Sequence, residues 1–80
     1  MSPFTLGTPA TYRIRIAGHL SPGWAGSFGE MKIIHQTAAD GSPYSVLTGR
    51  LVDQAALFGV LDNLYGLGFP LVSVECVEIN

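Results

Sequence analysis

The chain is short, apolar and weakly charged: its 80 residues are 48% hydrophobic and 12% charged, with a formal net charge of −2. This length allows one hydrophobic core and excludes a second domain. The charged share is about half of that usual in soluble domains, so either the core is unusually large for this length or apolar surface is left for a partner, and we favour the second. The single cysteine excludes an internal disulfide and a thiolate-rich zinc site.

Charge and hydropathy exclude several kinds of partner. The four basic residues are spread along the chain and cannot form a broad phosphate-neutralising patch, so no nucleic acid partner is expected. No apolar run approaches the roughly 20 residues that span a bilayer. The N-terminal segment lacks the basic start and long apolar stretch of a signal peptide. We therefore expect a cytoplasmic protein with no membrane contact.

The first part of the chain changes character near residue 10. Residues 1–10 hold two prolines and a glycine without periodicity, which predicts a flexible N-terminal arm before a single α+β domain over residues 11–80. Over residues 12–20, apolar and basic side chains alternate as in a half-buried strand. Gly18 near the end of this strand predicts a bulge or a close approach of the backbone to another group.

A glycine-rich connection over residues 21–29 carries Trp24 and Phe28, which belong to no strand or helix pattern. Their spacing of four residues can place both on one side of a helical turn. They can close one end of the core or act as anchors of an interface, and both interpretations stay open.

Two strands are predicted next, over residues 31–36 and 44–51, joined by a tight turn at Asp40-Gly41. His19 and His35 are the only imidazoles, and no carboxylate stands beside them at a recurrent metal spacing. We expect no metal site.

The final third of the chain gives the clearest local signals. Asp53 suits the N-cap of a helix, while Gly68 and Pro70 suit its end. Residues 71–79 are rich in β-branched side chains and predict a fourth strand. The apolar helix face is formed by residues at three- and four-residue spacing: Ala56, Leu57, Val60, Leu61, Leu64 and Leu67.

Two glycines, Gly59 and Gly66, lie inside the predicted helix, where each costs about 1 kcal/mol relative to alanine. A close-packed neighbour would compensate for this cost. We therefore expect the sheet or a second helix to contact the helix at these glycines.

The elements predict an α+β fold with a four-stranded mixed sheet and one helix packed on one face. The first three strands form a meander, and the fourth runs parallel to the third and lies beside the first, which gives the order 3-2-1-4. Cys76 is expected to be buried. The side chains expected to face the helix are Ile14, Ile16, Val72, Val74 and Cys76.

The opposite sheet face is predicted to mix polar and apolar residues. Arg13, Arg15 and Glu75 lie there and can form a cross-strand ion pair or bind an anion. No catalytic residue and no cofactor is predicted. The candidate interaction or ligand residues are Trp24, Phe28, Arg13, Arg15, Tyr44 and Glu75.

Two resemblances follow from these residues. The pair Trp24 and Phe28, together with the ending DQAALFGVLDNLYGLGFPLVSV, resembles a group of short bacterial proteins of unassigned function with the ending DQAALxGxLxxLxxLGxPLxSV. That resemblance implies a small cytoplasmic bacterial protein and no activity. The ending is also similar in rhythm to one βα unit of regulatory ACT domains, which have two helices in a βαββαβ order.

We expect a small non-catalytic, self-associating protein-interaction or adaptor module that forms a homodimer or a higher homo-oligomer. One alternative is an ACT-like regulatory domain with a small-molecule pocket at a subunit interface, lined by Arg13, Arg15, Trp24 and Tyr44. A second alternative is a small isomerase or cyclase at such an interface. Its titrating groups would be His19 or His35 with Glu30 or Glu75.

Overall fold

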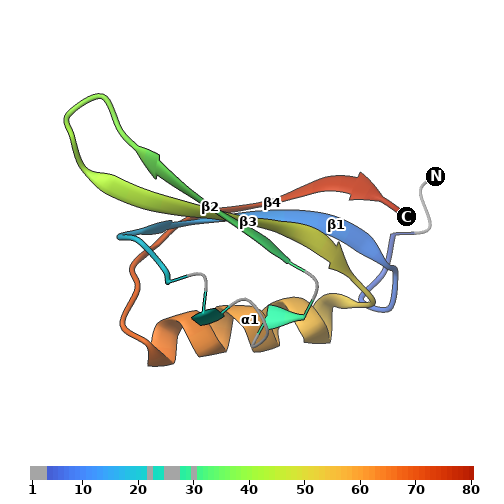
Figure 1. The fold of residues 1–80 in the computed structure, drawn as a ribbon. Coiled ribbons are helices and arrows are strands. Elements are labelled where there is room, and N and C mark those ends of the chain that lie inside the picture. The colour runs from blue at the N-terminus through green and yellow to red at the C-terminus, as the bar shows by residue number, and fades with distance from the viewer. Residues whose placement is uncertain (1–3, 22, 25–27, 30) are drawn as a thin grey trace.

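The computed structural model describes residues 4–21, 23–24, 28–29 and 31–80. Its elements are β1 (Ala10–Ala17), β2 (Lys32–Thr37), β3 (Pro43–Leu51), α1 (Gln54–Gly66) and β4 (Leu71–Ile79). Figure 1 shows the strands as one sheet, with α1 and the β1–β2 connection on the same side of it. We call this side the helix face and the other side the open face. The α+β class and the single helix packed on one face are as predicted.

The sheet differs from the predicted one in strand order and direction. The order is β2-β3-β1-β4, and every neighbouring pair is antiparallel. The predicted order 3-2-1-4 and the mixed sheet are therefore wrong. The prediction placed consecutive strands side by side, which is only a tendency. Here the long β1–β2 connection over residues 18–31 carries the chain past β3, so β1 pairs with β3 instead of β2.

Two parts of the predicted topology are confirmed. The last strand does lie beside the first. Since β3 and β4 are both antiparallel to β1, they run in the same direction, as expected for strands joined by a single helix. The sheet is not mixed because β1 lies between them.

The core lies between β1, β3, α1 and the β1–β2 connection. Strand β1 is paired on both sides, and its inward residues Ile14 and Ile16 are completely buried. From α1, the residues Leu57, Val60 and Leu64 pack into this core. The connection adds buried apolar side chains of its own, and so acts as a wall beside the helix. These are Leu20, Phe28 and Met31.

The helix begins and ends where the sequence predicts. The Asp53 carboxylate accepts a hydrogen bond from the Ala56 backbone N–H at 2.8 Å, which makes Asp53 the N-cap. At the other end, Gly68 has φ +88°, and the N–H of Phe69 reaches back to the carbonyl of Leu64 at 3.1 Å. This Schellman-type ending requires a residue that tolerates positive φ.

Gly18 also has positive φ, +96°, and a Cβ added there would lie 3.3 Å from the ring of Phe69. The predicted close approach at Gly18 is thus confirmed. The contact joins the end of β1 to the turn that follows α1.

The hairpin between β2 and β3 turns at Asp40-Gly41, as predicted. Gly41 has φ +88°, and the Asp40 carboxylate accepts from the Ser42 N–H at 2.9 Å. Hydrogen bonding from the side chain and the backbone N–H of Ser42 lowers the pKa of Asp40.

Residues 4–9 accept two backbone hydrogen bonds from later parts of the chain. The Leu6 carbonyl accepts from the Gln54 N–H at the start of α1, and the Pro9 carbonyl accepts from the Asn80 N–H. Ala10 is buried as the first residue of β1.

The helix carries an exposed surface that the sequence did not predict. A Cβ added at Gly59 or Gly66 would meet nothing within 4 Å, so the close packing expected at these glycines is not found among the described residues. Phe58 and Tyr65 are 60% and 83% exposed. No helix in the described part of the chain is long and apolar enough to cross a membrane.

Candidate functional site

The open face of the sheet carries an ion pair between neighbouring strands. Arg13 of β1 lies opposite Glu75 of β4, and the Arg13 Nη1 and Glu75 Oε1 atoms are 2.8 Å apart. Both side chains are partly exposed, 36% and 50%, and pairs in such surroundings contribute at most about 1 kcal/mol to stability. The pair therefore holds the Glu75 carboxylate towards β1 more than it stabilises the fold.

A hollow of about 380 Å³ lies further along the open face, next to Arg15. Arg15 and Tyr44 both line it, so the structure brings together two of the residues predicted to share a ligand site. Arg15 is exposed and, among the described residues, forms no ion pair. The rest of the lining is mostly apolar: Ala17, Ala38, Ser42, Pro43 and Val72. The hollow thus combines one free guanidinium with an apolar floor.

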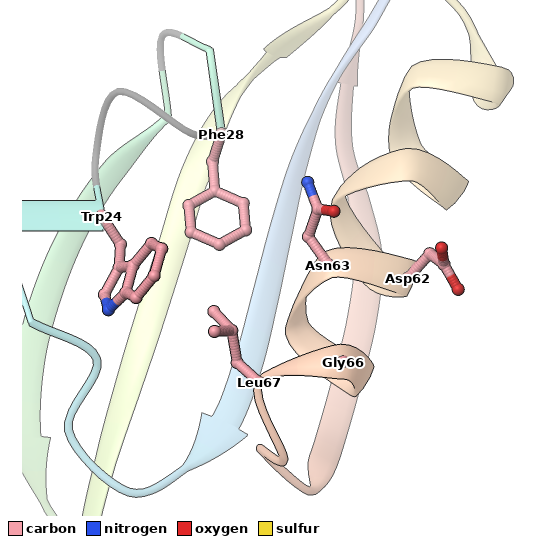
Figure 2. Close-up of a pocket in the computed structure, with 6 residues that line it drawn as sticks. All are labelled: Trp24, Phe28, Asp62, Asn63, Gly66 and Leu67. Atoms are coloured by element: carbon pink, nitrogen blue, oxygen red, sulfur yellow. The ribbon is translucent and has the colours of Figure 1, made fainter.

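Trp24 and Phe28 lie on the helix face instead. Phe28 is buried at 2% exposure and closes the core, while Trp24 is 43% exposed. Figure 2 shows the two rings across a groove from the C-terminal half of α1. This groove has a volume of about 470 Å³, and its helical wall is formed by Asp62, Asn63, Gly66 and Leu67.

The predicted site residues therefore separate into two groups on opposite faces of the sheet. Arg13, Arg15, Tyr44 and Glu75 lie on the open face, whereas Trp24 and Phe28 lie with the helix. A pocket that joins Trp24 to the arginines within one chain is not formed.

The two histidines approach each other, which the sequence left open. The rings of His19 and His35 are stacked, with centroids 4.5 Å apart and planes 2° apart. His19 Nε2 donates to the Gln36 carbonyl at 3.0 Å, and His35 Nε2 donates to the Leu20 carbonyl. The ring stacking and the two hydrogen bonds link the start of the β1–β2 connection to β2. In the described residues no cluster of three metal-ligating side chains is present, and Glu30 lies outside those residues.

Strand β4 is the feature that sequence reasoning missed. Val74 and Cys76 share the side of Ile14 and Tyr12, as predicted, but Val72 was also predicted there and instead lines the hollow on the open face, because the pairing of β4 with β1 shifts at this residue. The helix α1 contacts the sheet mainly at β3 and, among the described residues, leaves β4 exposed. Cys76 is exposed, so its predicted burial is wrong. The exposed aliphatic side chains of β4 are Leu71 (54%), Val72 (63%), Val74 (37%), Val77 (44%) and Ile79 (51%).

The sequence did contain a signal for this surface. The chain has few charged residues for its length, and its single predicted helix can cover only one of the two sheet faces. What it lacked was the strand order, which places β4 at an edge beyond the reach of the helix.

A family model described as "Domain of unknown function (DUF8691)" matches residues 11–75. The chain belongs to this family. The DUF8691 match covers β2, β3 and α1 completely, and nearly all of β1. It includes both members of the Arg13–Glu75 ion pair. No curated protein and no solved structure matches the chain.

Proposed function

We propose that this DUF8691 chain is a small non-catalytic, self-associating protein-interaction or adaptor module, and that the edge strand β4 is its contact surface. The observation that carries the proposal is the exposure of β4 on both of its sides. Every large aliphatic side chain of the strand is at least 37% exposed, although the strand is hydrogen-bonded into the sheet beside β1.

A free edge strand presents unpaired backbone N–H and C=O groups as well as side chains. In β4 this edge is largely aliphatic: its sequence LVSVECVEI contains two glutamates but no lysine, arginine or proline. Pairing with another strand satisfies the backbone groups and removes aliphatic surface from water, at about 25 cal/mol per Å². Both effects favour association.

The proposal is tested by the molar mass in solution, measured by light scattering over a wide concentration range. The wild type is expected to form a dimer or a larger closed assembly. Val74→Arg on β4 should give a monomer, since it places a charge in the contact. Ile34→Arg on β2 is the matched control, because Ile34 is also a β-branched aliphatic residue on an edge strand, with 43% exposure against 37%.

Circular dichroism and urea unfolding show whether both variants fold. A wild-type chain that stays monomeric at the highest concentration would overturn the proposal. An equal loss of association in Ile34→Arg would show that the contact surface is not specific to β4.

A second candidate function is the binding of a small anionic molecule, as in a regulatory domain with an ACT-like βα unit. The hollow lined by Arg15 and Tyr44 favours it, because the guanidinium has no acidic partner among the described residues. Thermal-shift screening of small carboxylates and phosphates tests this. A ligand at 100 times its dissociation constant adds about 2.7 kcal/mol to stability, and Arg15→Ala should abolish the shift.

We also infer that this chain groups with the short bacterial proteins that share its ending. The match to DUF8691 extends through residues 53–74, the segment DQAALFGVLDNLYGLGFPLVSV. Within it, Asp53 and Gly68 have structural roles as the N-cap and the helix end. These roles explain why such an ending would be shared, and they imply no activity.

A further inference from the structure

The sequence of β4 has a symmetry that a free edge does not need. In the segment LVSVECV, from Leu71 to Val77, polar residues stand only at Ser73 and Glu75. Each of these two positions is one residue away from Val74. If the segment is reversed about Val74, polar residues therefore fall on polar positions and apolar residues on apolar positions. This arrangement favours an antiparallel pair of identical strands, because each residue then lies opposite one of similar polarity.

Geometry limits the possible registers of such a pair. A two-fold axis perpendicular to the sheet keeps both helices on one side, and one residue of β4 then lies opposite its own copy. Centring on Glu75 sets two carboxylates against each other. Centring on Ser73 sets Leu71 against Glu75, and centring on Cys76 sets Glu75 against Val77. Each of these registers contains a like-charge or polar–apolar mismatch.

Centring on Val74 avoids these mismatches. It pairs Val74 with Val74 and Ser73 with Glu75, and it places Cys76 opposite Val72, the residue that is skipped where β4 pairs with β1. Residues 73–76 of β4 pair in step with β1, and the two register shifts fall at Val72 and Val77. The centre of the proposed pair, residues 73–75, therefore lies within the regular stretch. A regular stretch offers an undistorted ladder to a second strand.

The charges on the open face support the same register. Arg13 lies opposite Glu75 and Arg15 lies opposite Ser73 on the neighbouring strands of one copy. In the Val74-centred pair, Ser73 of the second copy lies opposite Glu75, and Arg15 of that copy lies one strand further. Its guanidinium can extend over the small serine to the carboxylate. Glu75 would then lie between two arginines, one from each copy.

We propose that two copies of this chain pair β4 against β4, antiparallel and centred on Val74, to form one continuous eight-stranded sheet. This inference rests on the proposed self-association and adds its symmetry, register and charge contact. Both α1 helices lie on the same side of the sheet. Arg15, which has no ion pair within its own described chain, gains Glu75 of the second copy as a partner.

The natural cysteine distinguishes this register from others. Cys76 lies opposite Val72 of the second copy, and the two Cys76 residues are four positions out of register, about 14 Å along the strands. A disulfide needs Cα atoms about 4.4–6.8 Å apart. The wild-type dimer should therefore resist cross-linking through Cys76, although the thiol is exposed.

Single cysteines in a Cys76→Ser background test the register by oxidation and non-reducing electrophoresis. Val74→Cys should cross-link to itself rapidly. Ser73→Cys and Glu75→Cys should each react slowly alone, because their copies are two positions out of register, but should cross-link rapidly when mixed. Light scattering on each variant shows whether it still associates.

The outcomes separate this inference from the function on which it rests. Fast cross-linking of Val74→Cys and of the mixture supports the Val74-centred pair. A dimer by light scattering with fast self-cross-linking at residue 75, or with none at residues 73–75, overturns the register and leaves self-association standing. A monomer at all concentrations overturns both.

The charge contact has its own test. Arg15→Ala should weaken dimerisation by about two- to five-fold at low salt, and this difference should shrink in high salt. Arg50→Ala is the matched control, since Arg50 is an exposed arginine on β3 and away from β4. Equal effects of the two substitutions would overturn the contact between Arg15 and Glu75.

Discussion

The two edges of the sheet differ in how the chain protects them. Strand β2, at one edge, carries Lys32 and the polar residues His35, Gln36 and Thr37. The imidazole of His19 donates to the carbonyl of Gln36, and its ring stacks on His35. Charge and a side chain from the preceding connection therefore both blunt the β2 edge, as in many monomeric sheet proteins.

Strand β4, at the other edge, carries two acidic residues instead, Glu75 and Glu78, and Glu75 is paired with Arg13 of β1. It contains no basic residue, and the helix that would cover its apolar side packs against the sheet nearer β3. The contrast indicates that the open β4 edge is not a general defect of a small sheet. The two edges thus differ in the sign of their charge and in their aliphatic exposure, and such an asymmetry would suit the proposed association through one edge only.

The largest expected effect comes from removing the protection of β2. Replacing Lys32 and Gln36 together by valine leaves two apolar edges on opposite sides of one sheet. A chain with two open edges can associate without closure, so we expect assemblies larger than the wild-type form that grow with concentration. Light scattering measures this. An unchanged molar mass would show that edge polarity does not control association here.

The next effect concerns the stability of the contact between β3 and the β1–β2 connection, which depends on Ser45. The buried Ser45 hydroxyl donates to the Gly18 carbonyl at 2.8 Å and accepts from the Leu20 N–H at 2.9 Å. Ser45→Ala leaves both backbone groups unpaired and should lower the free energy of unfolding by about 1–3 kcal/mol. Urea denaturation checks this, with Thr48→Ala on the same strand as the control. Association through β4 should persist wherever the variant is folded.

Gly59→Ala tests whether α1, and not the β4 edge, takes part in association. An added Cβ meets nothing within 4 Å, so alanine should raise the free energy of unfolding by about 1 kcal/mol through helix propensity. The gain is read from urea denaturation, and the dimerisation constant should stay unchanged. Weaker association in this variant would place the second copy against α1 and not against β4.

The smallest effect lies at the tip of the hairpin that joins β2 to β3. Hydrogen bonding from Ser42 lowers the pKa of Asp40 below its ordinary value of 3.8. The resulting stabilisation is present above that value and is lost as the pH falls through the lowered pKa. Compared with Asp40→Asn, the wild type should be more stable near pH 6, and the difference should shrink towards pH 2. A difference that does not change with pH would contradict the hydrogen-bond assignment.

Local chemistry in the sequence is a good guide to some of these features. The carboxylate of Asp53, the positive φ of Gly68 and the turn at Asp40-Gly41 depend on neighbours within a few residues. For that reason the bounds of α1 and β4 and the position of the hairpin could be predicted. The alternation in β1 likewise predicts which of its side chains are buried.

The candidate site was only partly predictable. The arginines and Glu75 were placed on one sheet face by alternation alone, and Arg15 and Tyr44 do line one hollow. Trp24 was assigned to the same pocket, but it lies on the helix face because the β1–β2 connection passes beneath the sheet. The stacking of His19 on His35 joins segments that are distant in sequence, and no local pattern marks it.

By itself, the sequence determined the fold class, the elements, the helix caps and the shortage of charge, since these follow from short-range backbone preferences and composition. Only the tertiary structure decided that β1 lies between β3 and β4, and hence that Cys76 and Val74 are exposed at an edge. The physical reason is that strand order depends on how a long connection crosses the sheet, and exposure depends on which strands the single helix covers. Both are properties of the packed chain, which the alternation within β4 does not encode.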